Sequence, residues 1–144
     1  MTREPPIIFT SWTRWADHNQ LKNAHLPGVY LLARFDDAET PPSERADPSS
    51  GDIVYIGEVV DQSLMGRWQQ FHRAAFEGKP GHSAGLRYHE MFGEGGEDDG
   101  ALYVSAFVPE GLSREMRSLF IRYVAHKLVW EWAREWGGAP VCNV

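Results

Sequence analysis

The chain has 144 residues, 42% of them hydrophobic and 24% charged, which is enough for one globular domain with its own core and too little for a second full domain. Its single cysteine, Cys142, excludes an internal disulfide and a multi-cysteine zinc site. No apolar run is long enough to cross a bilayer, and the first residues lack the pattern of a secretory signal. We therefore expect a soluble, cytoplasmic protein with no membrane contact.

The net charge of −6, taken alone, argues against an anionic partner such as nucleic acid. Residues 36–52 contain six acidic residues and one arginine, and residues 90–99 contain five acidic residues and no basic one. Both segments are rich in Gly, Pro, Ser or Asp, which predicts solvent-exposed loops. These loops carry −10 and the remaining chain +4, so the net charge does not exclude nucleic acid.

The predicted elements begin with a lead-in over residues 1–26, whose tryptophans among polar residues suit a short helix packed on the body of the domain. β-Branched and aromatic residues then predict one strand in PGVYLLARF (27–35) and a second in GDIVYIGEV (51–59). The acidic loop 36–52 is an insertion between these strands. Because the two strands follow each other along the chain, we expect them to be neighbours in the sheet.

Helical spacing starts after Ser63 and stops at the glycines and proline of residues 78–81, and a shorter helix is predicted over residues 82–94. ALYVSAFVP (101–109) predicts a third strand. Ser113 offers an N-cap for a last helix that can run to Trp136, before two glycines. The order β, β, α, α, β, α predicts a small α/β (α+β) domain with a three-stranded mixed or antiparallel sheet flanked by helices.

Several short motifs occur in a recognisable order. PGVY at 27–30 and VYIG at 54–57 resemble the two signature strands of the GIY-YIG nuclease family. RWQQFHRAAFEGKPGHSAGLRYHEMF (67–92) resembles the segment of phage-type homing endonucleases of that family in which an arginine, a histidine and a Gly-rich turn with a second histidine follow one another. The terminal PVCN (140–143) resembles the closing Pro-x-x-Asn element. The likeness spans residues 27–144, which we expect to form one GIY-YIG-like nuclease domain.

The resemblance implies a DNA endonuclease that hydrolyses phosphodiester bonds with Mg²⁺ or Mn²⁺. Tyr30 and Tyr55 would be the paired tyrosines, one of them the general base for the attacking water. Arg67 would stabilise the charge on the pentavalent phosphate. His72 and His82 would assist proton transfer or bind flanking phosphates. The spacing of five residues between Arg67 and His72, however, predicts that their side chains leave the helix in nearly opposite directions.

Three further residues belong to the implied site as structural members. Gly28 and Gly57 are the glycines of the two signature strands, and Asn143 would secure the C-terminal segment beside the site. The loop 36–52 is a departure from the family, whose signature strands are usually separated by fewer residues. An exposed hairpin loop tolerates such an insertion because closure entropy grows slowly with length.

The metal-binding glutamate that the family places on its last helix has no single counterpart. Aligned from the start of the helix, Arg122 occupies that position, whereas alignment backwards from Asn143 selects Glu131. Glu115 is a third candidate because it lies seven residues before Arg122, on nearly the same helical face. If Arg122 replaces the carboxylate, the domain is a degenerate member that acts as a nucleic-acid-binding or protein-interaction module, with a protein partner or a second copy of itself.

Other features of the last helix have simpler explanations. Trp130, Trp132 and Trp136 at helical spacing predict a packing stripe in the core or in an interface. The excess of arginine and lysine on this helix indicates either a phosphate-contacting face or a solvated one.

Overall fold

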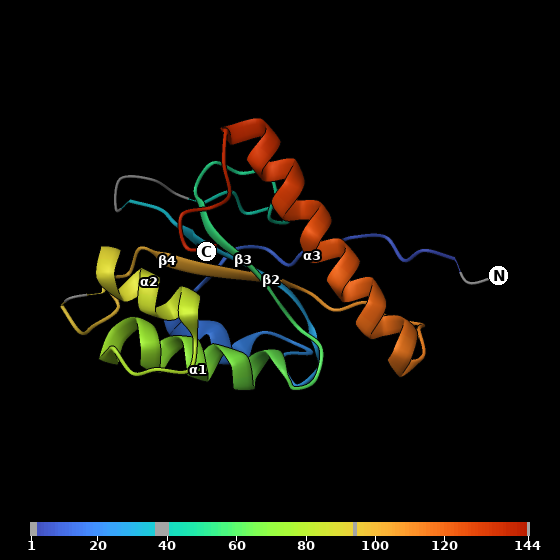
Figure 1. Cartoon of the computed structure of the whole chain (residues 1–144), viewed down its shortest axis with the longest axis horizontal. Helices are drawn as coiled ribbons and strands as arrows, with labels where there is room; N and C mark the ends of the chain where they lie inside the picture. The colour runs from blue at the N-terminus through green and yellow to red at the C-terminus, as the bar shows by residue number, and fades with distance from the viewer. Residues whose placement is uncertain (1–2, 37–40, 94, 144) are drawn as a thin grey trace.

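A four-stranded antiparallel sheet lies between two helical layers in the computed structural model, which describes residues 3–36, 41–93 and 95–143 (Figure 1). Helices α1 and α2 cover one face of the sheet and α3 crosses the other. The strand order is β1-β4-β2-β3. In chain order the elements are β1 (Thr13–Arg14), the 3₁₀ helix η1 (Trp15–Gln20), β2 (Gly28–Arg34), β3 (Ile53–Val59), α1 (Leu64–Glu77), α2 (Ser83–Phe92), β4 (Leu102–Phe107) and α3 (Arg114–Trp136).

The predicted α+β class is confirmed, with one difference in the number of strands. The sheet has four strands rather than three, because the two-residue strand β1 pairs with β4, and every pairing is antiparallel. A two-residue strand is too short to show a period of two in the sequence. The predicted neighbours β2 and β3 do pair, and β2 lies in the interior of the sheet between β3 and β4.

Strand β2 is buried almost along its whole length because helices cover both of its faces. Its side chains alternate: Tyr30 and Leu32 pack under α1 and α2, while Val29, Leu31 and Ala33 pack under α3. This two-sided burial explains the nearly continuous apolar run in the sequence. Two separate cores result, one on each face of the sheet.

Each long helix begins and ends at residues suited to the task. The Ser63 and Ser113 side chains accept hydrogen bonds from the first turns of α1 and α3. Gly78 and Gly137 adopt the left-handed conformation that ends these helices. The first turn of α1 also contacts the lead-in, because the backbone N–H groups of Leu64 and Met65 donate to the carbonyls of Leu26 and Ala24.

The lead-in and the loop 36–52 both contact the body of the domain. Trp15 of η1 is buried in the core under α1. The described part of loop 36–52 lies against the end of α3, where the Trp132 and Trp136 indoles donate to the carbonyls of Ser50 and Ser49; its residues 37–40 lie outside the described ranges. In the parts of the chain that the structure describes, no helix has the length and apolar character needed to span a lipid bilayer.

Candidate functional site

Two tyrosines meet on the sheet face that α1 covers. Tyr30 of β2 pairs with Gly57 of β3, and Tyr55 lies two residues before Gly57, so both phenols project from the same face. Their ring centroids are 5.7 Å apart with an interplanar angle of 64°. A Cβ on Gly57 would lie 2.5 Å from the Tyr55 ring and 2.6 Å from that of Tyr30. Only glycine at position 57 therefore lets the two rings approach each other in this way.

His82 is the buried partner of the first tyrosine. It precedes α2 as its N-cap and is only 2% exposed. The backbone N–H of Gly85 donates to His82 Nδ1 at 3.1 Å, so the neutral ring carries its proton on Nε2 and donates to Tyr30 Oη at 3.0 Å. Burial, helped by the charge of Arg67, lowers the pKa of His82 to about 4. At neutral pH His82 is thus an uncharged positioning group for Tyr30.

The two phenols differ in their access to solvent. Tyr30 is completely buried, and this burial raises its pKa well above the usual value. Tyr55 lies at the surface of a cleft. Burial also raises the pKa of Tyr55, while the guanidinium of Arg67 acts in the opposite direction. Tyr55 is therefore the phenol that a bound molecule can reach, and Tyr30 stands behind it.

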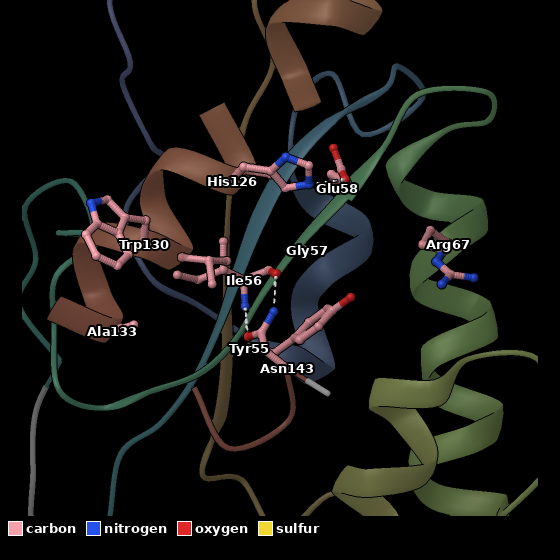
Figure 2. Close-up of a pocket in the computed structure, with 11 residues that line it drawn as sticks. Tyr55, Ile56, Gly57, Glu58, Arg67, His126, Trp130, Ala133 and Asn143 are labelled. Carbon is pink, nitrogen blue, oxygen red and sulfur yellow. Dashed lines mark hydrogen bonds and ion pairs between the residues drawn. The ribbon is translucent and has the colours of Figure 1, made fainter. Parts of the chain in front are cut away.

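Arg67 lies in the first turns of α1, across from Tyr55. Its Nη1 donates to Gln70 Oε1 at 2.8 Å and to the carbonyl of Gly81 at 3.3 Å, which holds the guanidinium between α1 and the turn before α2. No ion pair with a carboxylate involves Arg67 within the ranges described above. Figure 2 shows the Tyr55 side chain directed from β3 towards Arg67. The charge of Arg67 is thus available to an anion that enters beside Tyr55.

The cleft beside these residues has a volume of about 710 Å³ and wraps around the edge of β3 (Figure 2). Tyr55 and Arg67 line one side of it. The opposite side is formed by Glu58 at the end of β3 and by one face of α3. The α3 residues that line the cleft are Ala125, His126, Val129, Trp130 and Ala133.

Three cleft residues were not anticipated from the sequence in this role. Glu58, His126 and Trp130 line the cleft. Trp130 is 62% exposed, so it does not belong to the core of the domain, and its place in an interface stays a prediction. Trp136 is also largely exposed, whereas Trp132 is buried as expected. One signal for Glu58 was available: it is the single charged residue in a strand that otherwise reads as apolar.

The first histidine of the motif series, His72, lies away from the tyrosines. His72 points towards η1, where its Nδ1 accepts a hydrogen bond from the Trp15 indole at 3.0 Å and its ring packs against Phe76. It lines a different surface hollow, together with residues of η1. The five-residue spacing after Arg67 thus has the predicted effect, and the structure does not bring His72 to the tyrosines.

Asn143 lies at the predicted end of the site and covers the free edge of β3. Its Oδ1 accepts from the backbone N–H of Ile56 at 2.9 Å, and its Nδ2 donates to the Ile56 carbonyl at 2.8 Å. The N–H of Cys142 donates to the carbonyl of Val54. The tail therefore satisfies backbone groups that an edge strand would otherwise expose. Gly28, the other structural glycine, lies at the start of β2, where a Cβ would come 2.5 Å from the carbonyl oxygen of Phe107.

The glutamates considered as metal ligands do not face the cleft. Glu115 and Glu131 are exposed, as is Arg122, and none of the three lines it. Within the described residues no group of three or more His, Cys, Asp or Glu side chains is placed to hold a metal ion. The carboxylate that does line the cleft is Glu58.

Comparisons with protein-family models, with curated proteins and with solved structures found no match to this chain.

Proposed function

We propose that this chain is a GIY-YIG-like DNA endonuclease that hydrolyses phosphodiester bonds with a divalent metal ion. The observation that carries the proposal is the meeting of Tyr55, backed by Tyr30, with the unpaired guanidinium of Arg67 at one cleft. The order of the motifs along the chain adds support, since residues from PGVY, VYIG and the Arg-His segment converge there. Such a site combines a phosphate-binding cation with a group that can orient water.

The side chains have distinct roles in this proposal. Arg67 binds the phosphate and stabilises the charge that develops on it, where a fixed guanidinium contributes most. Tyr55 orients the attacking water through its hydroxyl. Tyr30 and His82 are positioning residues, because both are buried and hydrogen-bonded to each other. Asn143 fixes the edge of β3 on which Tyr55 lies.

A divalent ion, when bound, neutralises phosphate charge and lowers the pKa of a water molecule. The cleft offers a carboxylate for it in Glu58, whose Oε2 is buried and has no hydrogen-bond partner. Mg²⁺ is commonly held by one or two carboxylates together with waters and substrate phosphates. The residues of the cleft therefore fit such an ion.

The test is cleavage of supercoiled plasmid DNA with Mg²⁺ or Mn²⁺. We expect nicking by the unchanged chain and a loss of roughly 100-fold or more in Arg67→Ala, comparable to the removal of other transition-state donors. Tyr55→Phe should also lose most of the activity. Arg73→Ala on the far side of α1 and Tyr103→Phe on β4 are matched controls and should cut normally. Cleavage that survives both Arg67→Ala and Tyr55→Phe would refute the proposal.

A second candidate is a module that binds DNA or a protein without cutting. The α3 residues that line the cleft include no carboxylate, and α3 also exposes an apolar stripe of Met116, Leu119 and Tyr123. A DNA binder must lose affinity steeply as salt rises, because binding releases counterions. Salt-dependent binding without cleavage would favour this candidate over the nuclease. Failure to bind DNA at low salt would leave a protein partner.

We further propose that the protein acts in the cytoplasm. The thiol of Cys142 is free and buried, and reducing compartments are where unpaired cysteines are ordinarily kept.

A further inference from the structure

We propose that Glu58 and His126 form the divalent-cation site of the cleft, in place of a glutamate on α3. Both residues line the cleft that contains Tyr55 and Arg67. The role of this cation in cleavage rests on the proposed function, whereas its binding is a property of the cleft that can be measured directly. Glu58 has a buried carboxylate oxygen without a hydrogen-bond partner, lies near His126 and projects from the face of β3 that α3 covers.

The unsatisfied oxygen belongs to the Glu58 carboxylate. Its Oε2 is shielded from solvent and has no hydrogen-bond partner among the described residues, although the side chain as a whole is about one-third exposed. A buried carboxylate oxygen without a donor is unfavourable, because it has lost its hydration and gained nothing in return. A cation at this oxygen would restore the missing interaction.

The second ligand comes from α3. His126 Nε2 lies 3.9 Å from Glu58 Oε1, which is too far for a hydrogen bond. Oxygen and nitrogen ligands bind Mg²⁺, Mn²⁺ or similar ions at about 2.1 Å, so two ligands of one ion can be up to about 4.2 Å apart. Oε1 and the unsatisfied Oε2 belong to the same carboxylate, so the observed separation allows this carboxylate and the His126 imidazole to reach the same ion. Figure 2 shows the two side chains directed towards each other across the end of β3.

The register of the sheet explains why this carboxylate faces α3. Glu58 pairs with Val29 of β2, whose side chain packs under α3, and so Glu58 projects from the same face. The Tyr55 side chain projects from the opposite face of the sheet, to which position 57 also belongs. Because β3 is an edge strand, the cleft reaches both faces around it, and the two sets of residues line one space.

The charges in the cleft favour the same assignment. Arg67 and Glu58 line the same cleft, so a phosphate bound at Arg67 would share that space with the carboxylate. Two anionic groups in one cleft repel each other, and a cation bound between them would offset that repulsion. Carboxylate and imidazole together suit Mn²⁺ and, with waters and phosphate oxygens completing the shell, Mg²⁺.

The experiment is a titration with Mn²⁺, in which free Mn²⁺ is measured by electron paramagnetic resonance without DNA. The unchanged chain should bind one Mn²⁺ saturably, and Mg²⁺ should displace it. Glu58→Gln, which keeps the shape of the side chain, should weaken binding at least tenfold, and His126→Ala should weaken it several-fold. Glu115→Gln and Glu131→Gln are matched controls and should bind as tightly as the unchanged chain.

A second measurement needs no variant. In the unchanged chain Mn²⁺ should broaden the nuclear magnetic resonance signals of the His126 ring well before those of the exposed His25 ring. The assignment is overturned if Glu58→Gln binds Mn²⁺ normally, if either control glutamate proves to be required, or if the unchanged chain shows no saturable binding up to about 10 mM, beyond the weakest ordinary divalent sites. Binding that depends on Glu58 without DNA cleavage would leave the cation site standing and remove the nuclease. Cleavage that is indifferent to Glu58→Gln would leave the nuclease standing and show that the cation at Glu58 has no role in it.

Discussion

Lowering the pH from 7 to 5 should destabilise the fold by about 2 kcal/mol through His82 alone. In the folded state His82 Nδ1 accepts the N–H of Gly85 and Nε2 donates to Tyr30, so the buried ring has no place for a second proton without breaking the cap of α2. Its pKa accordingly falls from 6.5 to about 4, through burial and the charge of Arg67.

The sign follows from which state binds the proton. Below pH 6.5 the unfolded chain takes up a proton on His82, whereas the folded chain does so only near pH 4. The contribution of His82 to stability is therefore complete above pH 6.5 and is lost progressively as the pH falls towards 4. At pH 5 the unfolded residue is almost fully protonated and the folded one is not, which gives the 2 kcal/mol.

The assay is urea unfolding at pH 7 and at pH 5, followed by tryptophan fluorescence. His82→Asn keeps a side-chain oxygen that can cap α2 but does not titrate, so its loss of stability between the two pH values should be smaller than that of the unchanged chain by about 2 kcal/mol. His25→Asn is the control, because the His25 side chain is exposed and lies outside the site, and this variant should show the same loss as the unchanged chain. Equal losses in the unchanged chain and His82→Asn would show that the reasoning from burial is wrong.

Three substitutions test other parts of the site. Gly57→Ala should destabilise the fold by about 1–3 kcal/mol in urea unfolding, because its Cβ would lie 2.5 Å from one tyrosine ring. Gly138→Ala is the control and should keep the stability of the unchanged chain, because position 138 faces open space. Equal stability of the two variants would contradict the packing argument. Asn143→Ala should lower the free energy of unfolding by about 1–3 kcal/mol in the same assay, since it leaves a backbone N–H and a carbonyl of β3 unpaired. An unchanged unfolding midpoint would show that the stability of the fold does not depend on the Asn143 side chain. If the cleft binds DNA, Trp130→Ala should weaken DNA binding roughly 5- to 150-fold in a fluorescence titration, because base stacking is lost, and should leave the stability unchanged. Tyr123→Ala is the control, because Tyr123 lies outside the cleft. Equal effects of the two substitutions would exclude stacking at Trp130.

Much of the fold could be predicted because its elements have strong local signals. The long helices carry serine caps at their starts and left-handed glycines at their ends, and β2 and β4 are nearly continuous apolar runs. Strand β1 could not be predicted in the same way. It exists because the lead-in happens to lie along β4, which is a tertiary contact with no periodicity of its own.

Some features of the candidate site could likewise be predicted from the sequence, and others depend on tertiary contacts. The juxtaposition of Tyr30 and Tyr55 follows from two neighbouring strands and a glycine, all of which the sequence displays. The direction of His72 away from Arg67 also follows from helical spacing. The proposed role of Glu58 does not follow from the sequence, because it depends on the face of β3 to which position 58 belongs and on the rotation of α3 that places His126 opposite.

The position and rotation of α3 explain why Glu115 and Glu131 do not line the cleft. Position 122 and positions 126, 129, 130 and 133 fall on nearby parts of the helical surface, but only the last four reach the cleft, since the helix crosses the sheet obliquely (Figure 1). Glu115 lies at the far end of that crossing and Glu131 projects outwards. A heptad relation to Arg122 is thus no guide to the cleft, because the relevant contact is made further along the helix.

The structure shows which of the charged residues lie at the cleft and which lie away from it. In the second acidic segment Asp99 pairs with Arg34 at 2.7 Å, and no described residue of either acidic segment lines the cleft. The formal charges that do line it are those of Arg67 and Glu58, which cancel while His126 is neutral. A divalent cation at Glu58 would make the same cleft positive, and a bound metal ion is often the largest charge in its site. Affinity for a phosphodiester should then depend on that ion far more than on the −6 of the whole chain.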